Sequence, residues 1–283
     1  MPAPAPSSAA TRRQLRSLGL RPRKALGQHF LVDPLALEAI LAAAELGPAD
    51  TVIEVGPGLG ALTAALAQVA GRVIAVELDP ALAQALERRF PAQRRVTVVQ
   101  GDILRLPPAA LLAQAQVPPP YKVVSNLPYA IATATIRHFL EASPPPSLMV
   151  VTVQREVARA MVAAPGAQSL LSVAVQLYGE PALVRELPPQ SFHPAPKVAS
   201  GIVRIRVRGQ PAVAPEAPTA FLALVQAGFA ARRKQLRNSL AQGLGIAPAA
   251  AGRWLERCGI GPTRRAETLT LPEWEQLYRT RGT

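Results

Sequence analysis

Residues 122–129, KVVSNLPY, place groups that could hold a flat nitrogenous ring directly after an apolar run. The Asn126 side chain carries a carbonyl oxygen, and Pro128 restricts the backbone before it, so the Leu127 carbonyl can point the same way. Two such acceptors would bind the hydrogens of an exocyclic amine, while the ring of Tyr129 offers a face for a base to stack on. The segment also fits an ordinary strand and turn, because Asn and Pro are common turn residues.

A glycine-rich stretch, EVGPGLGALT, forms a second candidate site. Gly56, Gly58 and Gly60 follow one apolar run and open a helical pattern, so the backbone there can turn tightly and approach a ligand. Glu77 ends the next apolar run, about 20 residues after the first glycine, where a carboxylate can hold a ribose diol. This spacing indicates a ligand that contains adenosine.

The glycine loop alone leaves that ligand open. The spacing Gly56-x-Gly58-x-x-Ala61 also fits a dinucleotide fingerprint, in which a helix N-terminus faces a pyrophosphate. Glu54 would repel a pyrophosphate but suits the cationic methionine end of S-adenosylmethionine, and Asp102 can accept a hydrogen bond from the adenine amine. Either carboxylate alone fits an ordinary strand end, but carboxylates at three successive strand ends favour S-adenosylmethionine.

Alternating strand and helix patterns must position these residues. Strands interleaved with helical segments predict a parallel sheet with helices on both faces, and strands buried on both faces should be continuously apolar, as these are. Ligands of open α/β sheets bind beyond the carboxyl ends of the strands, so Asn126, Glu77 and Asp102 should face one crevice. The expected strands are residues 51–55, 72–77, 95–102, 121–126 and 147–154, with two more in PALVRELPP and GIVRIRVRG (201–209).

Composition divides the chain into four parts. The Pro/Ala/Ser-rich start should be disordered. The arginine run after it fits either a transit peptide or a basic arm near the fold. We prefer the arm, because the run leads into ALGQHFL, which looks ordered. A proline behind Asp33 predicts a helix over residues 34–46. The parts are a disordered or basic arm (1–20), an α/β domain (21–208), a Pro/Ala linker (209–218) and a small, basic helical domain (219–283).

Charge and cysteine content restrict the class of protein. The 31 Lys and Arg against 18 Asp and Glu give a formal net charge of +13, which indicates a polyanionic partner, nucleic acid ahead of an acidic membrane, although surface composition alone can produce such a surplus. The single Cys258 excludes an internal disulfide and a Cys-rich zinc site, and the scattered histidines suggest no metal. No apolar stretch approaches the roughly 18–20 residues that span a bilayer. We therefore expect a soluble, cytoplasmic protein with neither a metal nor a membrane partner.

Taken together, these motifs resemble the ribosomal RNA adenine N6-dimethyltransferase family. NLPY is similar to the motif of amino-methyltransferases that act on adenine, and KALGQHFL, IEVGPGLGALT, VELD and QGDIL are similar to other motifs of the family. FHPAPKVASGIVRI and FAARRKQLRNSL resemble its later motifs, so the resemblance runs from about Arg23 to the C-terminus. RRKQLRNSL and the helical tail look like the small-subunit (KsgA) branch. The Erm antibiotic-resistance branch, which acts on large-subunit rRNA, is the close alternative.

The resemblance implies a Rossmann-like S-adenosylmethionine-dependent methyltransferase fold, with a mostly parallel seven-stranded sheet, helices on both faces and a small all-α C-terminal domain. Asn126, Leu127, Pro128 and Tyr129 would be catalytic, and Phe192 resembles the second ring that sandwiches the target adenine, although a core aromatic is its alternative. Many members carry Asn where this chain has His29. The cofactor residues implied by the resemblance are His29, Leu31, Gly56, Glu77, Asp102 and Asn126, to which the loop adds Glu54, Gly58 and Gly60.

The implied substrate is a pair of adjacent adenines in the hairpin near the 3′ end of 16S rRNA, each methylated twice late in small-subunit assembly. We expect a monomeric enzyme. A non-catalytic rRNA-binding assembly factor and an NAD-dependent dehydrogenase are the alternatives from other classes. The intact cofactor and NLPY residues argue against a non-catalytic factor. The surplus of basic residues argues against a dehydrogenase, which would leave it unexplained. Expected RNA-binding residues are Arg23, Lys24, Lys197, Arg232, Arg233, Lys234 and Arg237, although a solvated helix face also explains the last four.

Overall fold

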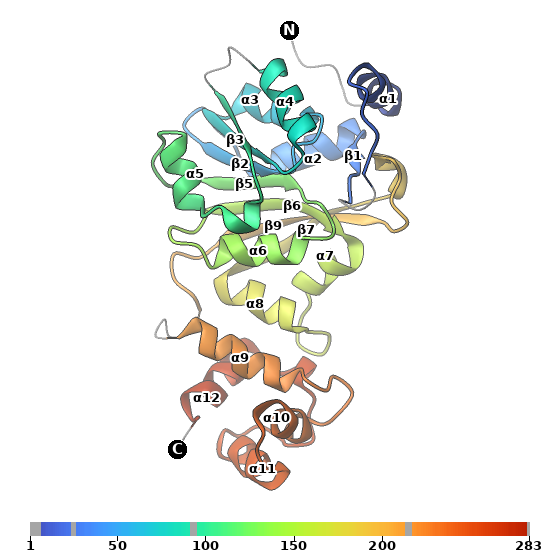
Figure 1. Ribbon diagram of the computed structural model, residues 1–283. Coiled ribbons are helices and arrows are strands. Elements are labelled where there is room, and N and C mark those ends of the chain that lie inside the picture. Colours follow the sequence, from blue (N-terminus) through green and yellow to red (C-terminus); the bar gives the residue numbers. More distant parts are fainter. Residues whose placement is uncertain (1–6, 24–26, 91–94, 213–216, 282–283) are drawn as a thin grey trace. The chain divides into compact units, whose positions relative to one another are not determined.

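The computed structural model describes residues 7–23, 27–90, 95–212 and 217–281 (Figure 1). Lys24, the first six residues and part of the expected linker therefore lie outside the described residues. The chain forms two compact units, the first made of residues 1–158 and 182–207, the second of residues 159–181 and 208–283. This division differs from the expected boundary, because residues 159–181 group with the C-terminal helices.

The first unit contains most of a seven-stranded sheet, in the order β4-β3-β2-β5-β6-β9-β7. The pairs β3–β4, β2–β3, β2–β5 and β5–β6 are parallel, and β9 is antiparallel to β6. The strand order reverses between β2 and β5, which is where such sheets bind ligands. The strands are β2 (Thr51–Val55), β3 (Arg72–Glu77), β4 (Val96–Gln100), β5 (Lys122–Asn126), β6 (Leu148–Gln154), β7 (Gly179–Leu187) and β9 (Ser200–Val207).

Helices pack on this sheet through apolar side chains. Ile40 and Leu66 form one core cluster with Val73 and Val150 of the strands. The helix expected over residues 34–46 begins as predicted, because the Asp33 carboxylate accepts hydrogen bonds from two N–H groups behind Pro34. The helices of this region are α2 (Pro34–Ala44), α3 (Ala61–Val69), α4 (Pro80–Arg89), α5 (Pro108–Gln114), α6 (Ala132–Leu140) and α7 (Arg155–Met161), with a 3-10 turn at Ile103–Arg105.

A short two-stranded sheet joins two segments that are far apart in the sequence. Strand β1 (Phe30–Leu31) pairs antiparallel with β8 (Phe192–His193), which follows a 3-10 turn at Pro189–Ser191. The Ser191 hydroxyl donates to the Asp33 carboxylate at 2.7 Å. The family-like GQHFL and FHPAPK motifs are thereby held side by side.

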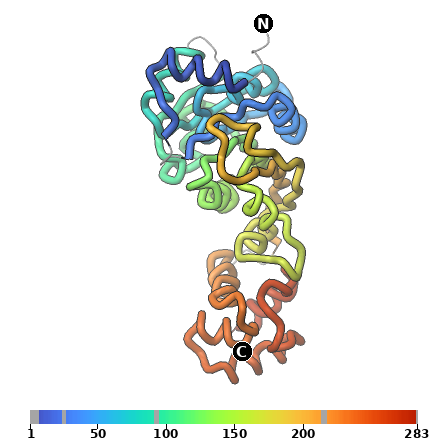
Figure 2. The backbone as a smooth tube through the Cα atoms, turned by 90° about the vertical axis from the view of Figure 1, so that its right-hand side faces the viewer, coloured from blue at the N-terminus to red at the C-terminus, as the bar shows by residue number. Residues whose placement is uncertain are grey.

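The N-terminal arm is not disordered throughout. Residues Ser8–Ser17 form helix α1, which lies on the surface of the first unit (Figure 2). The Ser7 hydroxyl caps the helix by accepting from the Ala10 N–H, and Leu15 is buried against Leu59 and Leu82. The start that we expected to be disordered is therefore helical at Ser8–Ala10, and the rest of α1 belongs to the arginine-rich arm that we expected near the fold. Composition did not indicate this helix, because the burial of Leu15 depends on residues distant in the sequence.

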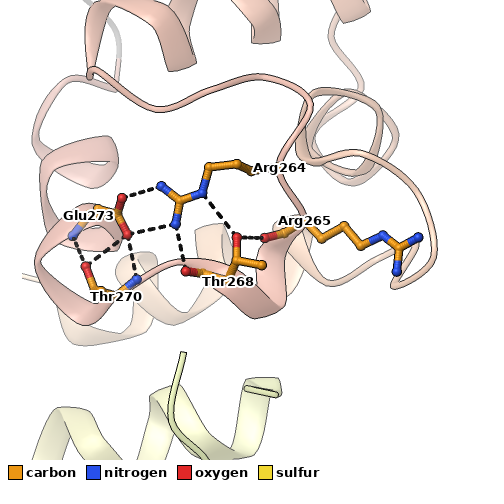
Figure 3. A network of polar contacts seen from close by, with 5 residues as sticks. All are labelled: Arg264, Arg265, Thr268, Thr270 and Glu273. Atoms are coloured by element: carbon orange, nitrogen blue, oxygen red, sulfur yellow. Dashed lines mark hydrogen bonds and ion pairs between the residues drawn. The ribbon is translucent and has the colours of Figure 1, made fainter. Parts of the chain in front are cut away.

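The second unit is helical around one apolar core. Leu240 and Leu255 pack there with Trp274, whose ring lies so close to Gly228 that a Cβ on that glycine would meet it at 2.3 Å. Glu273 pairs with Arg264 and accepts from the backbone at the start of its own helix (Figure 3). The helices are α8 (Leu170–Tyr178), α9 (Pro218–Gly228), α10 (Leu236–Leu244), α11 (Pro248–Arg257) and α12 (Leu271–Arg279), with a 3-10 turn at Ala266–Thr268. None of the helices that the structure describes combines the length and apolar character needed to cross a membrane.

Candidate functional site

Strand β2 runs into a tight glycine turn. Gly58 has a φ of +58° and Gly60 a φ of +78°, in the left-handed region that glycine adopts readily. A Cβ on Gly58 would lie 2.8 Å from the ring of Phe30, and one on Gly60 would lie 2.6 Å from Leu86. The turn therefore has room for neither side chain, and β1 and α4 hold it in place.

Glu77 holds this turn from the end of β3. Its Oε2 accepts from the Gly58 N–H at 3.0 Å, and its Oε1 accepts from the Asp79 N–H at 3.0 Å. Burial raises the pKa of Glu77, and these backbone donors oppose the rise. Each carboxylate oxygen keeps a second lone pair. Glu77 can therefore order the loop and still accept a hydrogen bond from a ligand.

Glu54 lies deeper, within β2, and is 2% exposed. Its Oε2 has no hydrogen-bond partner among the described residues. Burial raises the pKa of Glu54 to about 8, and the charge of Glu77 adds to this rise. At neutral pH the side chain is therefore mostly a neutral acid. A cation bound beside it would favour its ionised form.

Asn126, at the end of β5, presents an acceptor. Its Nδ2 donates to the His29 carbonyl at 2.9 Å, which fixes the amide orientation. Its Oδ1 is buried and has no partner within the part of the chain that the structure describes. Such acceptors are rare in folded proteins, because each costs about 1–3 kcal/mol. This oxygen is thus poised to accept from a ligand.

The residues after Asn126 pack tightly. The Leu127 N–H donates to the Thr152 carbonyl at 3.1 Å, and the ring of Pro128 lies against Gly56. The NLPY segment therefore contacts both strand β6 and the glycine turn. The orientation of the Leu127 carbonyl toward a base stays a prediction.

Tyr129 is held by two partners that the sequence did not reveal. Its hydroxyl and that of Ser200 lie 2.5 Å apart, and its ring lies 5.3 Å from that of His29. His29 is fixed in turn, because its Nδ1 lies 2.7 Å from the Pro194 carbonyl oxygen. Burial raises the pKa of Tyr129, so its phenol stays protonated at neutral pH.

Phe192 is 2% exposed and lies in the apolar core beside Leu31, its partner in the β1–β8 register. Phe192 does not line the cavity that Asn126 and Tyr129 share with the glycine turn. The arrangement matches the alternative interpretation, a core aromatic beside prolines. Stacking of Phe192 on a base stays a prediction, and it requires the side chain to leave this core.

A cavity of about 250 Å³ brings most of the expected site residues together. Gly60 supports the turn without lining the cavity. The sequence-based interpretation missed the contribution of α1, which supplies Thr11 and Gln14 to the lining. Within the described ranges, no three His, Cys, Asp or Glu side chains group so as to hold a metal ion. The expected residues that line the cavity are His29, Leu31, Glu54, Gly56, Gly58, Glu77, Asp102, Asn126, Leu127, Pro128 and Tyr129.

Most of the expected RNA-binding residues are exposed. Arg23 pairs with Asp79 at 3.1 Å, and Lys197 is exposed in the segment after β8. The 232–234 cluster lies in a turn between α9 and α10, because α9 ends at Gly228 and α10 begins only at Leu236. A solvated helix face therefore does not explain that cluster. Its role in binding RNA stays a prediction.

Comparison with known proteins gives consistent matches. Residues 19–279 match the family described as "Ribosomal RNA adenine dimethylase". Ribosomal RNA small subunit methyltransferase A of Dehalococcoides mccartyi (strain 195) is 48% identical, over 95% of this chain and 91% of that protein. The protein of the same name from Moorella thermoacetica is 42% identical, over 94% of both chains.

Solved structures show the same fold. The 23S rRNA methyltransferase ErmE superposes with a TM-score of 0.69 at 29% identity, over 90% of this chain and all of that one. A dimethyladenosine transferase from Plasmodium falciparum superposes with a TM-score of 0.72 at 23% identity, over 88% of this chain and 96% of that one. These likenesses, with the sheet order, confirm the predicted methyltransferase fold.

Proposed function

Because the chain belongs to the ribosomal RNA adenine dimethylase family, we propose that it dimethylates the N6 amines of two adjacent adenines in the 3′-terminal hairpin of 16S rRNA, with S-adenosylmethionine as methyl donor, late in small-subunit assembly. The single observation that carries this proposal is the buried, unpartnered Oδ1 of Asn126 in the cavity of the described residues. The relatives named small subunit methyltransferase A, at 42–48% identity, support 16S rRNA over the 23S rRNA of ErmE, at 29%.

The cavity suits this cofactor. When bound, S-adenosylmethionine supplies an electrophilic methyl group on a sulfonium cation. Glu54, whose buried oxygen has no partner among the described residues, would hold the cationic methionine end. Glu77 would accept from the ribose hydroxyls, and Asp102 from the adenine amine. The glycine turn leaves the backbone close to the ligand, because no Cβ fits at Gly58.

The residues of NLPY would act by positioning. Asn126 Oδ1 would accept from an N–H of the target amine, so that the nitrogen lone pair faces the methyl group. The ring of Tyr129, held by Ser200, would support the flipped base. Positioning suffices here, since a sulfonium is already a good leaving group.

The same acceptor accounts for two transfers to each adenine. A monomethylated amine keeps one N–H, which Asn126 Oδ1 can still accept. A dimethylated amine has no hydrogen left, so the buried oxygen loses its partner and the product binds more weakly. Two methyl groups per adenine are therefore the natural end point of this site.

The partner and the setting follow from the family and the charge. Exposed basic side chains would bind phosphates of the small-subunit rRNA, whose backbone attracts cations regardless of sequence. These side chains are Lys197, Arg232, Arg233, Lys234 and Arg237. We place this activity in the cytoplasm, where bacterial subunits assemble, and expect a monomeric enzyme.

The proposal is tested by incubating the protein and labelled S-adenosylmethionine with undermethylated small subunits, naked 16S rRNA and large subunits. We expect N6 label on two adjacent adenines of 16S rRNA. Label on 23S rRNA alone would assign the chain to the ErmE-like activity. Absence of label on every substrate, with the cofactor bound, would favour a non-catalytic assembly factor.

A further inference from the structure

Helix α1 contributes to the cavity although the match to the family model begins only at residue 19. Ser7 and Ala10, with Thr11 and Gln14 one turn further on, line the same cavity as the glycine turn and Asn126. Thr11 is a buried polar residue. The inner face of α1 therefore offers polar groups to whatever occupies the cofactor cavity.

The attachment of α1 to the fold is slight and lies at the glycine turn. Leu15 packs with Leu59 of the turn and Leu82 of α4, in a small cluster that Leu18, Leu20 and Phe30 join at its edge. The Gln14 side chain donates to the Leu59 carbonyl at 3.4 Å, which is long for a hydrogen bond. Leu15 is therefore the main apolar anchor of this helix, beside the buried Thr11 and the packing against β8. Its release would open the cavity on that side.

The outer face of α1 is basic. Arg12, Arg13 and Arg16 are exposed, and no ion pair joins them to an acidic residue within the described ranges. The helix also packs against β8, where partial burial and the charge of Arg12 lower the pKa of His193. Three guanidinium groups with no acidic partner among the described residues, beside the strand pair next to His29, suit a phosphate backbone.

We propose that α1 is a wall of the cofactor site that rRNA holds in place. Thr11 and Gln14 contact the bound cofactor from the inner face, and rRNA phosphates bind Arg12, Arg13 and Arg16 on the outer face. Because one helix carries both faces, bound rRNA retards the exit of the cofactor. This inference rests on the proposed function, since it takes S-adenosylmethionine and rRNA as the ligands.

The inner face is tested by binding of S-adenosylhomocysteine, without rRNA, to the full chain and to Leu15→Ser and Gln14→Ala. Loss of most of the Leu15 burial should detach α1, so we expect the Kd to rise at least roughly tenfold and dissociation to quicken in proportion. Gln14→Ala, which keeps α1 docked, should show a smaller rise. Leu35→Ser is the matched control, because Leu35 is 56% exposed on α2. Unchanged binding in both α1 variants would overturn the proposal.

The outer face is tested by the dissociation rate of S-adenosylhomocysteine at saturating 16S 3′-hairpin RNA. We expect the RNA to slow dissociation from the wild-type protein several-fold. The triple variant Arg12→Gln, Arg13→Gln, Arg16→Gln should lose this slowing but keep the RNA-free Kd. An RNA-independent rate in the wild type, or equal slowing in the triple variant, would refute the coupling. These readouts involve no methyl transfer, so they are distinguishable from failure of the proposed activity.

Discussion

Cofactor affinity should depend on pH through Glu54, whose burial raises its pKa to about 8. The ionised carboxylate attracts a sulfonium and the neutral acid does not, so binding requires a proton to leave whenever the pH is below this pKa. The fraction ionised is about one in a hundred at pH 6, one in ten at pH 7 and one half at pH 8. The Kd for S-adenosylmethionine should therefore fall roughly fifty-fold from pH 6 to pH 8 and level off near pH 9.

The assay is titration calorimetry of S-adenosylmethionine binding over this range, in two buffers of different ionisation enthalpy, which also counts the protons released. Glu54→Gln should bind weakly and lose most of this pH dependence, because its amide cannot ionise. Glu45→Gln, at an exposed carboxylate, is the matched control. S-adenosylhomocysteine, which has no sulfonium, should show a shallower dependence. A wild-type slope equal to that of Glu54→Gln would refute the reasoning.

Three further predictions concern stability and positioning. Arg264 holds the pKa of Glu273 below its usual value, so this pair stabilises the fold above about pH 4.5, and the stabilisation is lost as the pH falls through the lowered pKa. Glu273→Gln should therefore lower the free energy of unfolding in urea at pH 7 by about 1 kcal/mol, and the control Glu275→Gln should lower it much less. Gly58→Ala should cost about 1–3 kcal/mol and weaken cofactor binding, whereas Gly209→Ala, in open space, should be nearly neutral; equal effects would contradict the crowding argument. Ser200→Ala and Tyr129→Phe each remove the contact between the two hydroxyls, so each should lower kcat without changing the cofactor Kd. The double variant should be no slower than either single variant, and additive losses of kcat would show that the two hydroxyls act separately.

Local order in the sequence made much of the site predictable. Glu77 and Asn126 end their strands, and the glycine turn and Asp102 come directly after theirs. Parallel strands bring these carboxyl ends to one edge of the sheet. The types and positions of these residues therefore indicated both the cavity and its ligand class before any packing was known. The unpartnered oxygen of Asn126 adds what the sequence could not give, the orientation of the amide.

Features that depend on contacts between distant segments were not predictable. Ser200 reaches Tyr129 across 71 residues, and no local pattern marks that pairing. Phe192 lies in the core because β8 pairs with β1. Strands of two residues are too short for the sequence pattern to predict this pairing. The burial of Leu15 that docks α1 likewise depends on side chains of the glycine turn and α4, so the sequence suggested a basic arm near the fold but not this helix or its packing.

The central claim is that the Asn126 amide orients the target amine, and single-turnover methyl transfer to undermethylated small subunits by Asn126→Ala tests it most directly. We predict a rate at least roughly a hundredfold lower at saturating cofactor, with the Kd for rRNA nearly unchanged. Asn126→Asp, which keeps an acceptor, should recover part of the rate, and Asn238→Ala serves as the control at another asparagine. A rate for Asn126→Ala within about threefold of wild type, or loss of rRNA binding together with transfer, would contradict the account.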